Sequence, residues 1–80
     1  MNAEEITNAV KSVSISGVRQ VISHSKRPET TYTVMEFTWV DIEGVWVLYI
    51  SYMDTETNIL YARRADQFYN FSFGVGYGQF

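Results

Sequence analysis

Two runs of β-branched and aromatic residues, 31–40 and 45–53, constrain the fold of this chain more than any other feature. Valine, isoleucine, threonine and aromatic residues are typical of strands. Only the four residues 41–44, Asp-Ile-Glu-Gly, separate the two runs, and so short a connection joins antiparallel neighbours. The sequence therefore predicts an antiparallel β-hairpin.

The register of this hairpin follows from either of two turns. A loop over residues 41–44 pairs Val40 with Val45, and a tight Glu43-Gly44 turn pairs Ile42 with Val45. Both turns place odd-numbered residues of the first strand on the same face as even-numbered residues of the second. The face without a charged residue is the predicted core: Met35, Phe37, Trp39, Trp46, Leu48, Ile50 and Tyr52. Both tryptophans are therefore expected to be buried.

Shorter elements are expected before the hairpin. Apolar residues at spacings of three and four predict an amphipathic helix over residues 3–13, with Asn2 as its N-cap. The end of this helix stays open, because residues 12–16 alternate like a strand before Gly17. Residues 18–23 predict a strand, and residues 24–30, which contain the only proline, predict a loop.

After the hairpin, the polar turn 54–58 leads to a third strand at residues 59–62, and residues 63–70 predict a short helix or helical turn anchored by Phe68. An 80-residue chain has room for one hydrophobic core, so residues 1–80 are expected to form a single domain. The predicted class is α+β, mostly β: an N-terminal helix, a small antiparallel β-meander and a short C-terminal helical turn.

The C-terminal residues 71–80 alternate large side chains with serine or glycine. This pattern fits either a final strand with one bare face or a flexible tail. A bare glycine face allows close approach of another strand. As a strand, the segment would either close the protein's own sheet or form an interface with a second chain. In the second case the protein would be able to self-associate through this segment.

The composition contains no set of residues that supports catalysis. There is no cysteine and one histidine, His24, so neither a thiolate metal site nor a nucleophilic triad is expected. No glycine-rich phosphate loop precedes a helix. We therefore expect neither enzymatic activity nor a cofactor nor a metal ion.

Charge and hydropathy restrict the partners and the compartment. The net charge is -3 and the basic residues are scattered, whereas nucleic-acid binding normally needs a basic stripe. The acidic N-terminus lacks the features of a secretory signal, and the longest apolar stretch, residues 45–53, is too short to span a bilayer. A cytoplasmic protein without a membrane partner is expected.

The surplus of aromatic residues is the strongest functional feature. Five Phe, six Tyr and two Trp exceed what so small a core encloses, and exposed aromatic side chains are favoured at protein interfaces. Arg63 and Arg64 adjoin several of them and suit an acidic partner, although Arg63 would alternatively pair with Asp66. Glu36 is either an exposed residue or a charge that guards a sheet edge. The predicted partner-binding residues are Arg63, Arg64, Tyr69, Phe71, Phe73, Tyr77 and Phe80.

Residues 32–71 resemble a family of short bacterial and phage proteins of unknown function that look like SH3-type small β-barrels. The resemblance rests on Tyr61-Ala62-Arg63-Arg64-Ala65-Asp66-Gln67-Phe68, which keeps the family's aromatic residue, first arginine, acid and phenylalanine at the family's spacing. Arg64 stands where the family has proline, and the family's upstream His and Glu-Thr signature is missing. The resemblance implies an SH3-like barrel as the alternative to an open meander, and it brings no catalytic residue.

The same resemblance implies a phage or prophage accessory protein. Small proteins of that kind commonly bind and modulate a host protein. Together with the surplus of aromatic residues, this predicts a non-enzymatic protein-interaction module in the host cytoplasm that inhibits or modulates a host protein and is able to form a homo-oligomer. The alternative is a small-barrel nucleic-acid-binding protein that uses Arg63, Arg64 and exposed aromatic residues.

Overall fold

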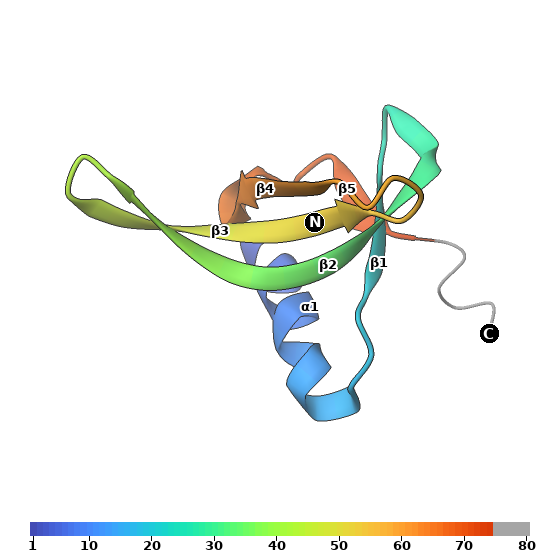
Figure 1. The fold of residues 1–80 in the computed structure, drawn as a ribbon, viewed down its shortest axis with the longest axis horizontal. Coiled ribbons are helices and arrows are strands. Elements are labelled where there is room, and N and C mark those ends of the chain that lie inside the picture. Colours follow the sequence, from blue (N-terminus) through green and yellow to red (C-terminus); the bar gives the residue numbers. More distant parts are fainter. Residues whose placement is uncertain (75–80) are drawn as a thin grey trace.

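The structure, a computed structural model, describes residues 1–74 and has the predicted class, α+β and mostly β (Figure 1). The elements are the helix α1 (Ala3–Ser16), the strands β1 (Val21–His24), β2 (Arg27–Ile42), β3 (Val45–Asp54) and β4 (Leu60–Arg64), the 3-10 helix η1 (Ala65–Gln67) and the strand β5 (Phe71–Phe73). The five strands form one antiparallel sheet in the order β4-β3-β2-β1-β5.

The sheet is a four-stranded meander to which β5 returns at the side of β1. Within residues 1–74, β4 and β5 are the two edges and do not pair with each other. The sheet is nevertheless strongly curved, and α1 lies against its concave side (Figure 1). The curvature brings side chains of β4 and β5 into contact: the Arg63 guanidinium carbon lies 5.1 Å from the centroid of the Phe71 ring.

Helix α1 has the N-terminus that the sequence predicted. The Asn2 side chain accepts a hydrogen bond from the Glu5 N–H (2.8 Å) and the Glu5 side chain accepts one from the Asn2 N–H (2.9 Å), which is a capping box. The helix continues to Ser16 because Gly17 adopts the left-handed conformation (φ 73°) and donates to the Val13 carbonyl. Residues 12–16 are therefore helical despite their alternating pattern.

Strand β2 begins earlier than expected, and the predicted loop 24–30 is wrong. Only Ser25 and Lys26 separate β1 from β2. Pro28 lies where the β1-β2 register shifts, between the pair His24 with Arg27 and the pair Ser23 with Thr31. A residue without an N–H is tolerated near the beginning of a strand and at a bulge, which is why this proline does not stop β2.

An irregularity between Val34 and Phe37 changes which residues of β2 face the core. Val34 pairs with Tyr52, whereas Phe37 pairs with Ile50, so β2 contains one residue more than β3 across this interval. Even-numbered residues of β2 therefore point inward before this bulge and odd-numbered residues after it. Val34 is fully buried, and Met35, which was expected on the core face, is only half-buried.

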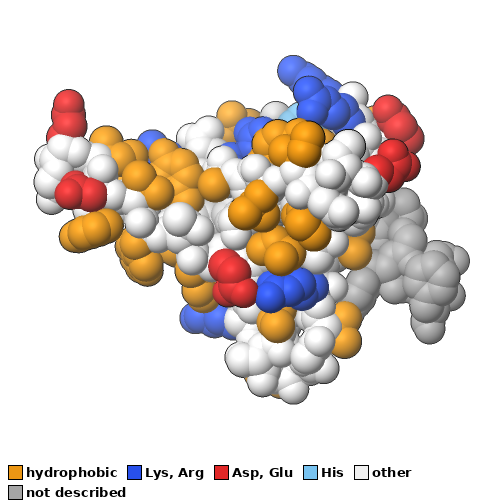
Figure 2. All heavy atoms as spheres, in the orientation of Figure 1, with side chains coloured by type: hydrophobic (Ala, Val, Ile, Leu, Met, Phe, Trp, Pro, Cys, Tyr) orange, Lys and Arg blue, Asp and Glu red, His pale blue; other side chains and the backbone are white. Residues whose placement is uncertain are grey.

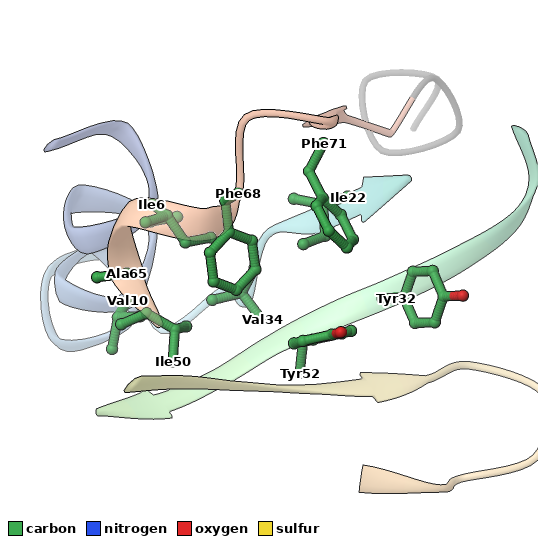
Figure 3. Packing of buried hydrophobic residues seen from close by; sticks show 11 residues of the cluster. Ile6, Val10, Ile22, Tyr32, Val34, Ile50, Tyr52, Ala65, Phe68 and Phe71 are labelled. Carbon is green, nitrogen blue, oxygen red and sulfur yellow. The ribbon is translucent and has the colours of Figure 1, made fainter. Parts of the chain in front are cut away.

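The core lies between α1, the curved sheet and η1 (Figure 3). Phe68, the predicted anchor, is fully buried and contributes about 1.5–3 kcal/mol by burial. Its ring centroid lies 5.6 Å from that of Tyr52 and 5.1 Å from that of Phe71. The buried apolar residues are Ile6, Ala9, Val10, Ile22, Tyr32, Val34, Ile50, Tyr52, Ala65, Phe68 and Phe71.

Candidate functional site: an apolar hairpin arm and a cationic pocket

Half of the β2-β3 hairpin extends beyond the rest of the sheet. Strand β4 pairs with β3 only between Met53 and Tyr49, and β1 pairs with β2 only up to Thr33. Residues 37–48 therefore form a two-stranded ribbon, here called the hairpin arm, with no neighbouring strand from residues 1–74 on either side. Figure 1 shows this hairpin projecting away from the helix and the other strands.

The hairpin arm ends in the tighter of the two turns considered from the sequence. Ile42 pairs with Val45, and the two turn residues Glu43 (φ 51°) and Gly44 (φ 84°) both have positive φ, as in a type I′ turn. The Asp41 side chain accepts a hydrogen bond from the Gly44 N–H at 2.9 Å. The tip therefore carries two carboxylates, and the arm contains no lysine or arginine.

Both tryptophans lie on the hairpin arm and are exposed. Trp39 is 60% exposed and Trp46 is 65% exposed. They share one face, as predicted, but the expectation that this face is buried there is wrong. The helix and the other strands cover the sheet only as far as Leu48, which packs partly against the core, so no described element covers the arm beyond it.

The hairpin arm is apolar on both faces. Phe37 and the two tryptophans are exposed on one face, and Ile42 and Val45 are exposed on the other. Figure 2 shows hydrophobic side chains along this projection and acidic side chains at its end. A two-stranded ribbon is marginally stable by itself, and exposed apolar surfaces are typical of interaction sites, so the arm is a candidate for one.

The free edge of β2 at the base of the hairpin arm is covered by Arg19. Its guanidinium donates to the Met35 carbonyl and forms an ion pair with Glu36 at 3.0 Å. Glu36 is exposed and also lies at the sheet edge, so it combines the two alternatives that its sequence position suggested. Edge pairing by another strand is therefore hindered at the base, whereas the faces of the arm remain accessible.

A second surface feature lies at the opposite end of β2. It is a cavity of about 220 Å³, here called the cationic pocket, and its lining combines aromatic with basic side chains and contains no acidic one. The lining residues are His24, Lys26, Arg27, Tyr32, Tyr52, Tyr61, Arg63 and Phe71. They come from β1, the β1-β2 turn, β2, β3, β4 and β5, so the curvature of the sheet assembles the pocket.

Contacts between the lining residues fix the position of Arg63. Its Nε donates to the Tyr52 hydroxyl at 3.2 Å, and its guanidinium lies over the Phe71 ring. The edge of the His24 ring packs against Phe71, with centroids 4.8 Å apart. His24 Nδ1 accepts a hydrogen bond from the Lys26 N–H at 3.0 Å.

The electrostatics of the pocket are positive. Desolvation, followed by the positive charges of Arg63, Arg27 and Lys26, lowers the pKa of His24 below its ordinary value. The side chain of Tyr32, which lines the same pocket, raises the pKa of Arg27. The neutral imidazole is therefore favoured in a pocket that already holds three cations.

Of the predicted partner-binding residues, the structure brings Arg63 and Phe71 together in the cationic pocket, but not Arg64. Arg63 lines the pocket, while Arg64 points elsewhere and pairs with Asp66 at 2.7 Å, so the ion pair considered for Arg63 is formed by Arg64 instead. Phe71 is only 5% exposed: it belongs to the core cluster and reaches the surface only as part of the pocket lining.

The remaining predicted residues differ in exposure and in whether the structure describes them. Tyr69 and Phe73 are exposed, as an interface requires. Tyr77 and Phe80 lie outside the described residues, as does most of the segment 71–80. Its described part does pair with the protein's own β1, and the Gly74 N–H donates to the Val21 carbonyl at 2.7 Å.

Sequence reasoning missed the hairpin arm and most of the cationic pocket. The arm has one signal in the sequence: the two hairpin strands are about twice as long as the strands expected beside them, so their far ends lack neighbours. The pocket has no local signal, because His24, Arg27 and Arg63 are brought together only by the curvature of the sheet.

Within the part of the chain that the structure describes, no three His, Asp or Glu side chains are grouped so that they could hold a metal ion. Among the same residues, no helix has the length and apolar character needed to cross a membrane. No family model matches the chain, and searches of curated proteins and of solved structures found no match.

Proposed function

We propose that this protein is a non-enzymatic protein-interaction module that binds its partner through the hairpin arm. The observation that carries this proposal is the exposure of both tryptophans on a ribbon whose two faces are apolar. Tryptophan is enriched among the residues that dominate binding energy at interfaces, and covering this surface removes apolar area from water. No folded element of residues 1–74 provides that cover.

The chemistry of the hairpin arm specifies the partner surface. The arm is apolar along its length and acidic at its tip, where Asp41 and Glu43 lie. A complementary partner presents an apolar groove with basic residues at one end. The resemblance to short bacterial and phage proteins supports a phage or prophage accessory protein that modulates a host protein in the cytoplasm, and a second copy of this chain is the other partner to test.

The alternative, nucleic-acid binding through Arg63 and Arg64, has less support. The two side chains diverge, one into the cationic pocket and the other toward Asp66. They do not form a continuous basic track, and phosphate contacts along a strand or duplex need one. The exposed aromatic residues of the hairpin arm lie beside carboxylates, which repel a phosphate backbone.

A comparison of three forms of the tagged full chain tests this proposal. The wild type, a Trp39→Ser/Trp46→Ser variant and an Ile15→Ser/Ile59→Ser control are used to capture proteins from bacterial lysate. The control removes two exposed apolar side chains outside the arm. We expect a partner that is stoichiometric with the wild type and the control and is lost with the arm variant, while all three forms keep the same circular dichroism spectrum.

Light scattering of the same three forms tests self-association. A wild-type dimer that becomes a monomer only in the Trp39→Ser/Trp46→Ser variant would identify the partner as a second copy. A partner or a dimer that the arm variant retains in full would overturn the proposal, because binding would then not depend on the arm.

A further inference from the structure

We propose that the cationic pocket is a small-ligand site that binds one phosphomonoester carried on a planar ring, with a nucleoside monophosphate as the ligand class. The pocket lies at the opposite end of β2 from the hairpin arm and shares no residue with it. The inference is therefore independent of the proposed protein partner.

The positive charge of the pocket is complementary to a ligand with two negative charges. Lys26, Arg27 and Arg63 line it, and none of the three forms an ion pair with a carboxylate of the described residues. The six residues after Gly74 contain no Asp or Glu side chain. Three cations around one cavity repel each other, and a phosphomonoester, with a charge of about -1.5 to -2 at neutral pH, offsets that repulsion.

The hydrogen-bond donors of the pocket also match phosphate oxygens. Because His24 Nδ1 already accepts the Lys26 N–H, the neutral ring carries its proton on Nε2 and has a donor to offer. The lining includes the hydroxyl-bearing Tyr32 and Tyr52 as well. Arg63 uses only its Nε on Tyr52, which leaves its two terminal nitrogens as paired donors of the kind that bind phosphate.

The aromatic side chains of the lining are the reason to propose a ligand with a planar ring. Tyr61, on the edge strand β4, is 41% exposed and stacks on Tyr52 with an angle of 26° between the rings. An aromatic side chain that is stacked on one side and accessible elsewhere offers a surface on which a base packs, typically tightening binding by about 5- to 150-fold per base.

The size of the pocket favours a single nucleotide over a strand of nucleic acid. A cavity of about 220 Å³ is smaller than most ligand pockets, so it holds one phosphate and part of a ring. The net charge of -3 and the ion-paired Arg64 provide no continuation of the positive surface for a second phosphate.

Titration of the isotope-labelled full chain, followed by NMR, tests the inference. The probes are adenosine monophosphate, inorganic phosphate, adenosine and phosphotyrosine. We expect saturable shifts at His24, Arg27 and Tyr61, with adenosine monophosphate binding about tenfold more tightly than inorganic phosphate, because one base stack adds about that factor. Adenosine, which lacks the charge, should cause no saturable shift.

Matched variants show whether binding takes place in the pocket. Arg27→Gln and Lys26→Gln each remove one charge from an exposed lining residue, and Lys11→Gln removes one charge from α1 outside the pocket. We expect each pocket variant to bind adenosine monophosphate about tenfold more weakly and Lys11→Gln to bind it as the wild type does. The Trp39→Ser/Trp46→Ser arm variant should also bind it normally, so a failure of the arm proposal leaves this result unchanged.

Three outcomes would overturn the inference. The first is the absence of saturable shifts with any phosphate-bearing probe at millimolar concentration. The second is equal weakening by Lys11→Gln and Arg27→Gln, which would indicate attraction by overall charge. The third is tighter binding of phosphotyrosine than of adenosine monophosphate, which would show that the ring is not a nucleobase.

Discussion

The Ser51 hydroxyl spans the bulge in β2 by contacting both backbone groups of Glu36: it accepts from the Glu36 N–H at 3.0 Å and donates to the Glu36 carbonyl at 3.2 Å. A bulge leaves its extra residue outside the regular ladder, and this hydroxyl replaces the missing partners. Ser51 is buried, so the two bonds are largely shielded from water.

Replacing Ser51 by alanine should lower the free energy of unfolding by about 1–3 kcal/mol, because both Glu36 backbone groups lose their partner in a partly buried position. Urea denaturation measures this loss. Ser72→Ala, at an exposed serine of β5, is the matched control and should change stability by less than about 0.5 kcal/mol. Equal effects of the two substitutions would show that the bulge does not depend on the Ser51 hydroxyl.

Truncation of Phe68 should destabilise the protein much more than truncation of Trp46. The alternation of apolar residues had instead placed Trp46 in the core. Phe68→Ala removes a fully buried ring and should cost about 3–5 kcal/mol. Trp46→Ala removes a side chain that is 65% exposed and should cost less than about 1 kcal/mol. Chemical denaturation of both variants decides the matter, and a larger loss for Trp46 would place the arm inside the core.

Gly74 should tolerate no side chain. An added Cβ would lie 2.9 Å from Val21 Cγ1 and 3.2 Å from the Val21 carbonyl oxygen. Because the carbonyl belongs to the backbone of β1 and cannot move freely, Gly74→Ala should cost about 1–3 kcal/mol. Thermal unfolding of this variant beside Ser72→Ala measures the difference. An unchanged melting temperature would mean that the end of β5 is not held against β1.

His24 should make the stability of the protein depend on pH. Folding lowers its pKa, so the unfolded chain binds the proton more tightly. The contribution of His24 is therefore fully present above its unfolded pKa, about 6.5, and decreases as the pH falls below that value. His24→Gln, which keeps an acceptor for the Lys26 N–H, should lose this dependence between pH 8 and pH 5.5.

The measurement for His24 is the free energy of unfolding of wild type and variant at matched pH values. Subtracting one free energy of unfolding from the other cancels the contribution of the carboxylates, because both proteins contain the same carboxylates. A difference that stays constant across this range, or that favours the wild type more at low pH, would contradict the lowered pKa.

The parts of the fold that the sequence predicted correctly depend on short-range interactions. Asn2 was predicted as the N-cap, and the Glu43-Gly44 turn was one of two turns that the sequence left open; each involves residues within four positions of one another. Phe68 was recognised as an anchor because it is a large apolar residue in a polar segment. Such features are encoded where they occur, so a single sequence is enough to find them.

The incorrect predictions concern which strands and side chains lie beside a given strand, because these neighbours come from distant parts of the sequence. Alternation showed that Trp39 and Trp46 share a face, but whether that face is covered depends on how far β1 and β4 extend. No particular residue type marks the bulge before Phe37. The sequence therefore did not reveal that the inward-facing residues of β2 change from even-numbered to odd-numbered there. The cationic pocket combines His24 with Arg63, which only the curved sheet brings together.

Strand β2 is one unbroken element from Arg27, in the cationic pocket, to Ile42, beside the tip of the hairpin arm. Tyr32 lines the pocket and Phe37 begins the arm, so at about 3.3 Å per residue roughly 17 Å of chain separates the two surfaces along β2. A small anion at one end and a protein at the other can therefore be held at the same time without touching. Strand β3 joins the same two surfaces, because its Tyr52 lines the pocket and its residues 45–48 belong to the arm. Between the two surfaces, the Ser51 hydroxyl ties β3 to β2 at the bulge.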